Sequence, residues 1–216
     1  MRTPRFRTII GLLSAPAIIA GGLAAFTLAS AAPAAAGQPV TQPLTPPPPS
    51  FETCKTVGNG FICEGARTEP YGATDTGIAC GTGTGAFDIF DQGTDYQHAI
   101  RFYDTDGNLT RRVIYDHYFS QWSNPLTGAA VPYMQHNTTT DVLAVPGDFT
   151  SATTTTTGEA NFTVPHMGAV FLNAGKVVFG ADGTLEFSAG PQGFVDYFNN
   201  GNTAALAELC TALGAS

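Results

Sequence analysis

The chain is built from runs of β-branched and aromatic residues that are separated by clusters of Gly, Asn, Asp and Pro. The two longest runs are Tyr96–Asp104 and Leu109–Trp122, and Asp106-Gly107-Asn108 lies between them. Asp-Gly between two such runs is typical of a tight β-turn, so this stretch predicts a long antiparallel hairpin. In the second run, neither of the two alternating sets of side chains is purely apolar. A strand with one side facing a cavity and the other side covered has this pattern.

The rest of the chain repeats the pattern at short spacing. Further strands are predicted at Phe61–Arg67, Ala86–Asp91, Val131–Asn137, Thr139–Val145, Phe149–Thr157, Phe162–Leu172, Lys176–Phe179 and Thr184–Ser188. The connecting turns are predicted at Asn124–Gly128, Pro146–Asp148, Asn173–Gly175 and Ala181–Gly183. Only Thr203–Leu213 has helical spacing of apolar residues, with Leu206, Leu209, Cys210 and Leu213 on one face. The sequence therefore predicts a mainly β protein, an antiparallel up-and-down barrel or sandwich with one C-terminal helix.

Three regions of different composition divide the chain. Residues 1–31 combine three Arg, the apolar stretch Ile9–Leu28 and the small residues Ala29-Ser30-Ala31, which predicts a cleaved signal peptide and a secreted protein. A second cleavage pattern at Ala34–Ala36 makes Gly37 an alternative first residue of the mature chain. Residues 32–50 are rich in Pro and are expected to be an extended spacer. Residues 51–216 then form a single β domain.

The net charge limits the partners. The full chain carries a formal charge of −8, and removal of residues 1–31 leaves six basic against 17 acidic side chains, a charge of −11. Such a chain repels nucleic acids and anionic membrane surfaces, so we expect neither as a partner. A small apolar ligand or a component of the cell surface remains a candidate partner, and we expect a monomer without a cofactor.

The four cysteines are Cys54, Cys63, Cys80 and Cys210, and an even number in an exported chain indicates two disulfides. Three pairings are possible. Gly58-Asn59-Gly60 is a strong turn signal between Cys54 and Cys63, so we predict that these two are bonded. The other bond then joins Cys80 to Cys210, and it would hold the C-terminal helix against the early strands.

Some of these features also occur together elsewhere. Cys80-Gly81, the Asp-Gly hairpin, Asn124-Pro125-x-Thr127-Gly128 and a terminal helix that contains Cys210 resemble a group of actinobacterial secreted proteins of unknown function. The resemblance implies an exported β domain and carries over no active-site residue.

The candidate catalytic residues are His98, Asp116 and His117. If the hairpin closes on the three-residue loop Asp106–Asn108, His98 lies opposite Asp116, and the pair could act as a general base and its orienting group. An ordinary polar contact between two strands is the alternative. The sequence has no G-x-S-x-G or H-E-x-x-H motif, and the run Asp104–Asn108 offers too few oxygen ligands for a calcium loop, so no metal site is predicted.

The aromatic residues of the hairpin are the candidate ligand-binding residues. They are Phe102, Tyr115, Phe119 and Trp122. A small barrel could hold one apolar ligand among such side chains, or it could be filled by them. Two classes of function therefore stay open, a non-catalytic binding or cell-surface module and a small secreted enzyme.

Overall fold

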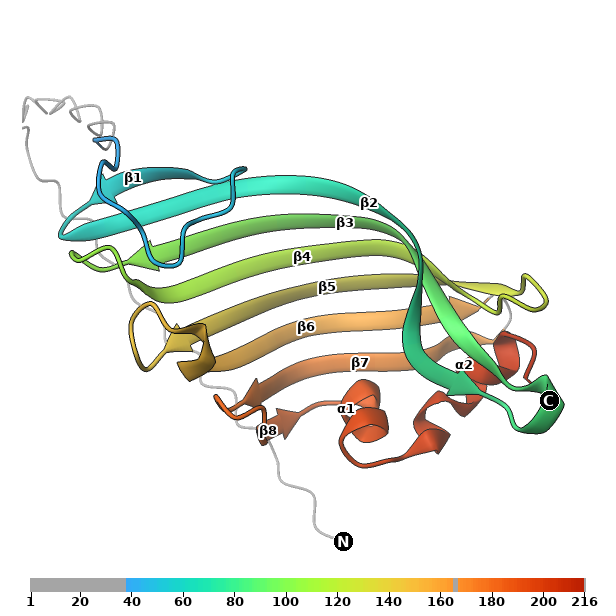
Figure 1. The fold of residues 1–216 in the computed structure, drawn as a ribbon. Helices are drawn as coiled ribbons and strands as arrows, with labels where there is room; N and C mark the ends of the chain where they lie inside the picture. The colour runs from blue at the N-terminus through green and yellow to red at the C-terminus, as the bar shows by residue number, and fades with distance from the viewer. Residues whose placement is uncertain (1–37, 165–166, 216) are drawn as a thin grey trace, which may run out of the picture. The chain divides into compact units, whose positions relative to one another are not determined.

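A computed structural model describes residues 38–164 and 167–215, and the predicted signal peptide lies outside the described residues. Eight strands follow one another in a single antiparallel sheet in chain order (Figure 1). They are β1 Thr53–Val57, β2 Gly60–Cys80, β3 Phe87–Tyr103, β4 Leu109–Ser123, β5 Ala130–Leu143, β6 Ala152–Val164, β7 Gly168–Phe179 and β8 Leu185–Ala189. The helical elements are η1 Gly83–Gly85, η2 Phe149–Ser151, α1 Gly193–Phe198, η3 Thr203–Leu206 and α2 Ala207–Ala212. The expected mainly β, up-and-down order is confirmed.

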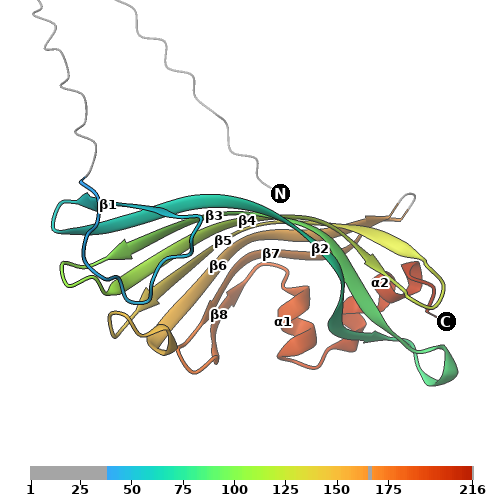
Figure 2. The ribbon, with the colours of Figure 1, turned by 45° about the horizontal axis from the view of Figure 1, so that its top comes forward.

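The sheet remains open, with β1 and β8 as its two edges, so it closes into neither a barrel nor a sandwich. Figure 2 shows that the sheet is curved and that the C-terminal helices lie against its concave face. The C-terminal helices cover one end of this face, and the segment of residues 38–50 covers the other end. Closure is therefore not needed to bury the apolar side chains.

Several strands are longer than the sequence pattern indicated. Strand β3 runs through Gln92-Gly93-Thr94, where two separate strands were expected, because Gly93 keeps its place opposite Ser120. The predicted turn at Asn173–Gly175 is wrong, since β7 continues through it. Gly175, with φ of +124°, pairs instead with Gly158 of β6.

The central hairpin forms as predicted, and its register differs by one residue. Gly107 turns the chain with φ of +81°, a conformation that favours glycine. Tyr103 pairs with Leu109 and Phe102 pairs with Arg111, so Thr110 is an extra residue in a β-bulge. From this bulge onward, each residue of β4 faces a partner one position away from the one expected for a regular three-residue loop.

The C-terminal segment covers one end of the concave face. The expected helix at Thr203–Leu213 is present as η3 followed by α2, whereas α1 was not predicted. Leu206, Leu209 and Leu213 are no more than 1% exposed. They pack in the larger apolar cluster, whose other buried members are Ile78, Cys80, Phe87, Ile89, Trp122, Val131, Tyr133, Ala160, Phe162, Val170 and Phe171.

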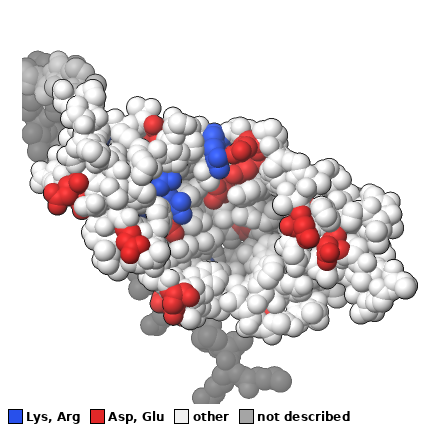
Figure 3. All heavy atoms as spheres, viewed as in Figure 1, with Lys and Arg blue, Asp and Glu red and all other residues white. Residues whose placement is uncertain are grey.

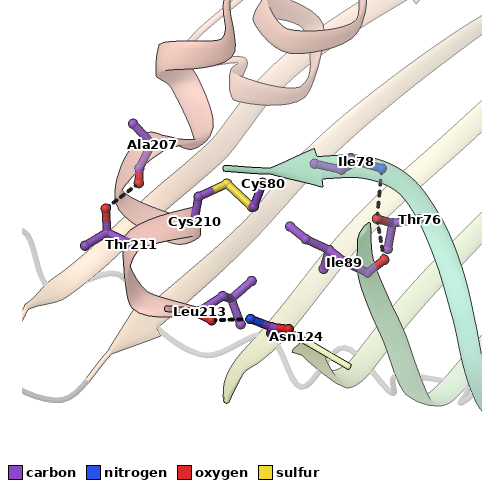
Figure 4. Close-up of a disulfide and its surroundings, with 9 residues drawn as sticks. All are labelled: Thr76, Ile78, Cys80, Ile89, Asn124, Ala207, Cys210, Thr211 and Leu213. Atoms are coloured by element: carbon purple, nitrogen blue, oxygen red, sulfur yellow. Dashed lines mark hydrogen bonds between the residues drawn. A yellow bond between two sulfur atoms is a disulfide. The ribbon is translucent and has the colours of Figure 1, made fainter. Parts of the chain in front are cut away.

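Both predicted disulfides are present. Cys54–Cys63 links the paired strands β1 and β2. Cys80–Cys210 joins the end of β2 to α2, with Cα atoms 5.4 Å apart (Figure 4). Beside it, the buried Asn124 donates a hydrogen bond of 3.1 Å from its side-chain amide to the carbonyl of Leu213 (Figure 4). The end of the chain is thus held by a covalent bond and a buried hydrogen bond.

The N-terminal segment covers the opposite end of the same face. The Thr45 amide donates to the Gly107 carbonyl and the Thr45 carbonyl accepts from the Leu109 amide, each at 2.8 Å. Tyr103 donates its hydroxyl to the Pro46 carbonyl at 2.9 Å, and Leu44 packs on the smaller apolar cluster around Leu109. Residues 38–50 therefore belong to the folded unit, whereas the Pro-rich composition had indicated a free spacer.

A buried ion pair follows this segment. Glu52 and Arg101 are 9% and 8% exposed, and Arg101 Nε donates to Glu52 Oε1 at 2.9 Å. Burial raises the pKa of Glu52, and the hydrogen bond and charge of Arg101 act in the opposite direction.

None of the helices in the described ranges is long and apolar enough to cross a membrane.

Candidate functional site

The middle of the concave face lies between the two covered ends and is polar. Side chains that point to this face from neighbouring strands include Gln97, Asp116, Tyr118 and Gln135, as the register of their strands requires. Most of this central row is only half-buried, whereas the apolar clusters at the two ends are buried. Figure 3 shows that this face is hollowed in its middle and that acidic side chains gather beside the hollow.

The first part of this region is an acidic hollow of about 360 Å³ between β2, β3 and β4. Its lining residues are Glu69, Tyr71, Thr74, Asp75, Thr76, Asp91, Asp95 and Tyr118. One oxygen of Asp91 accepts the hydroxyl of Tyr71 at 3.0 Å. The other oxygen of Asp91 and the Oδ1 atom of Asp95 are buried and have no hydrogen-bond partner in the described part of the chain. We call this site the acidic hollow.

Few basic groups balance these carboxylates. Arg67 lies close by, but its guanidinium pairs with Glu69 at 2.7 Å. Asp116 is buried and accepts a hydrogen bond of 3.1 Å from the Gln97 side chain. Burial raises the pKa of Asp95 and of Asp116, and the charge of Asp116 adds to the rise at Asp95. The hollow therefore concentrates negative charge that the protein only partly compensates.

Tyrosine rings form part of the wall. Burial raises the pKa of Tyr71 and of Tyr118 to about 12, and the neighbouring carboxylates add to this shift. Both hydroxyls therefore keep their protons at neutral pH and can donate or accept hydrogen bonds.

The raised pKa of Asp95 predicts a stability effect. Between the ordinary value of 3.8 and the raised value, the folded protein holds a proton that the unfolded chain has lost. The free energy of unfolding therefore falls as the pH rises through this interval. The contribution of Asp95 to stability is lowest at pH values above the raised pKa. Asp95→Asn should stabilise the protein at about pH 7. Since Asp95 is only half-buried and solvent screens its charge, the gain should be below about 1 kcal/mol, or less than about 2–4 °C in melting temperature.

Thermal unfolding from about pH 3 to pH 8 measures this effect, since the gain should vanish below the ordinary pKa of aspartate. Asp88→Asn, an exposed residue of the same strand, is the matched control and should change little. A loss of stability in Asp95→Asn at neutral pH, or a gain that persists at acidic pH, would contradict the electrostatic assignment.

A second recess adjoins the acidic hollow, and its one acidic lining residue, Glu159, pairs with His136 of the convex face. The recess has a volume of about 140 Å³ and lies over β5, β6 and β7. We call it the amide notch, because four of its eleven lining residues carry a side-chain amide. The lining consists of Gln135, Asn137, Thr156, Gly158, Glu159, Ala160, Asn173, Gly175, Val177, Gln192 and Phe194. Gln135 is the register partner of Tyr118 in the wall of the hollow, so the two recesses meet at the boundary of β4 and β5.

Glycine forms the floor of the notch. Gly158 and Gly175 pair across β6 and β7 with φ of +146° and +124°. A Cβ atom at Gly158 would lie 2.1 Å from the His136 carbonyl oxygen, and one at Gly175 would lie 2.1 Å from that of Ala189. Neither position can carry a side chain without a shift of the backbone, so bare backbone remains at this point of the face.

The structure separates the predicted catalytic residues. Because of the bulge, Asp116 faces Gln97 on the concave side, whereas His98 faces Tyr115 on the convex side. The predicted pairing of His98 with Asp116 is therefore wrong. His98 instead contacts Glu64, with 3.0 Å between Nε2 and Oε1. His117 also lies on the convex face, where its ring packs against that of His136 at 4.4 Å between centroids.

The four predicted ligand-binding aromatics do not line one cavity. Tyr115 and Phe119 lie on the convex face and are 41% and 56% exposed. Phe102 is on the same face, with the Arg111 guanidinium 4.0 Å from its ring centroid. Trp122 points the other way and is buried in the larger apolar cluster.

Asp116 is the one predicted site residue that lies beside the acidic hollow. Asp91 and Asp95 of β3 and Tyr71 of β2 were not selected from the sequence. Alternation along β3 could have placed the two carboxylates on one face with Gln97, since all three are odd-numbered. The positions of Asp95 opposite Glu69 and of Asp91 opposite Thr74 depend on the register of β2, which no turn residue indicates.

No three His, Cys, Asp or Glu side chains in residues 38–164 and 167–215 are grouped so that they could hold a metal ion.

Comparisons of the chain with models of protein families, with curated proteins and with solved structures gave no match. The resemblance to actinobacterial secreted proteins thus stays a prediction.

Proposed function

We propose that this protein is a non-catalytic binding module that works outside the cytoplasm and takes a small organic cation in the acidic hollow. The observation that carries the proposal is the pair of buried, unpartnered carboxylate oxygens of Asp91 and Asp95. An unpaired buried charge is costly, and a ligand ammonium group would supply both the missing hydrogen bonds and the opposite charge. Two disulfides support a location in an oxidising compartment.

The lining of the hollow favours a cation over the apolar ligand expected from the sequence. Four carboxylates and no basic side chain belong to its wall. The rings of Tyr71 and Tyr118 offer faces that attract cations. The volume of about 360 Å³ lies within the range of small-molecule sites. A catalytic role of His98 and Asp116 together has no support, because they lie on opposite faces.

Calorimetric titration with putrescine tests the proposal, with 1,4-butanediol as the neutral ligand of the same length. We expect putrescine to bind and butanediol not to bind. Asp95→Asn should weaken putrescine binding by about tenfold or more, since a charge-assisted hydrogen bond contributes about 1.5–3 kcal/mol. Affinity should also fall with added salt, as expected for an ionic contact.

Asp88→Asn is the control, because it removes the same charge from an exposed position of β3. It should leave the affinity for putrescine nearly unchanged. Equal binding of the diamine and the diol, or an equal loss in the two variants, would show that the hollow is not the site.

A further inference from the structure

The acidic hollow and the amide notch are adjacent recesses that follow one another across the strands, and we call them together the trough. From Asp95 on β3 the trough passes Tyr118 on β4 and Gln135 on β5 and reaches Ala160 on β6. Neighbouring strands are about 4.8 Å apart, so these positions span roughly 14 Å. This length exceeds a single sugar ring or a short diamine, and the chemistry changes along it from carboxylates to side-chain amides.

The notch contains buried polar atoms that lack partners. Gln192 is 6% exposed, and its amide nitrogen donates to the carbonyls of Ala174 and Ala189, each at 3.1 Å. Its Oε1 atom and the Oδ1 atom of Asn137 are buried without a partner within the described ranges. Two amide oxygens without donors indicate a ligand that brings donors of its own.

Hydroxyl groups meet this requirement better than other neutral groups. The notch combines side-chain amides, the Thr156 hydroxyl and the ring of Phe194. Amides can donate and accept at once, which suits hydroxyls that do the same, and an aromatic ring can cover the apolar side of a sugar ring. Gly158 and Gly175 add no side chain to the lining, so the polar groups of the notch come from its amides and from Thr156.

From this trough we infer that the ligand is an oligosaccharide that carries a free amino group, with the amine in the acidic hollow and hydroxyls of a linked ring in the amide notch. The inference rests on the proposed cation site and adds to it a second subsite. Two linked subsites should bind one ligand more tightly than either binds a fragment.

Three ligands separate the two subsites in calorimetric titrations. They are the β-1,4-linked trisaccharide of glucosamine, cellotriose, in which hydroxyls replace the amino groups, and putrescine. We expect the amino trisaccharide to bind about tenfold or more tighter than either of the others. Asp95→Asn should lower its affinity to about the level of cellotriose.

Asn137→Ala tests the notch by itself. It should weaken both trisaccharides by about tenfold and leave putrescine unchanged, because its amide lies beyond the hollow. Thr138→Ala, the next residue of β5 and on the convex face, is the matched control. Asn137→Ser keeps a hydroxyl and should lose less, and thermal unfolding of each variant confirms that it folds.

The outcomes distinguish the two proposals. Suppose that putrescine binds and that Asp95→Asn weakens its binding. If the amino trisaccharide then binds no tighter than putrescine, or if Asn137→Ala leaves its affinity unchanged, the oligosaccharide inference is wrong and the cation site stands. If putrescine does not bind the unaltered protein, the cation site fails, and the inference built on it fails too.

Discussion

Replacing both Cys80 and Cys210 by serine should destabilise the protein more than replacing both Cys54 and Cys63. The first bond closes a sequence separation of 130 residues and the second a separation of nine. In the chain-entropy model these loops correspond to about 5 and about 3 kcal/mol. The loss should be largest around α2, because Cys210 is its covalent link to β2.

Denaturant unfolding of the two double variants measures the difference, and hydrogen exchange locates it. We expect faster exchange of the amides in α2 only in the variant without Cys80–Cys210. The buried Leu206, Leu209 and Leu213 should keep part of the segment in place. Equal losses in the two variants would mean that apolar packing alone holds the C-terminal segment.

Phe162→Ala should lower the free energy of unfolding by about 3–5 kcal/mol, as large cavities in aromatic cores do. Phe162 is 0% exposed and lies at the centre of the larger apolar cluster. Its ring centroid is 4.5 Å from that of Trp122, 4.6 Å from Tyr133 and 5.5 Å from Phe171. The near-ultraviolet signal of Trp122 should weaken with the loss of this contact.

Phe119→Ala provides the matched control on the other face of the sheet. Phe119 is 56% exposed on the convex side, so its removal should cost less than about 0.5 kcal/mol. Similar losses for the two phenylalanines would contradict the assignment of the concave face as the buried one.

Most features of the fold that could be predicted from the sequence were predicted from turn residues. Gly107 and the Gly58–Gly60 turn fix two hairpins, and the pairing of Cys54 with Cys63 follows from the second. The strand order then follows from short connections. The open sheet could not be foreseen, because it depends on residues 38–50 packing at one end of the concave face.

The site was harder to predict because it depends on register. One extra residue, Thr110, places His98 and Asp116 on opposite faces, and a bulge has no reliable sequence signal. The irregular pairing of β2 between Tyr71 and Ala79 likewise brings Asp75 into the same hollow as Asp91 and Asp95. Polar residues that look unremarkable along the chain are thus gathered by two irregularities in the sheet.

A crystal structure grown with putrescine tests the central claim most directly. The cation site predicts the diamine in the acidic hollow, with one ammonium nitrogen within hydrogen-bond distance of Asp91 Oδ1 or Asp95 Oδ1. Asp95→Asn crystals grown in the same way should lose or weaken this density. A diamine bound elsewhere, or an acidic hollow without it at saturating concentration, would contradict the account.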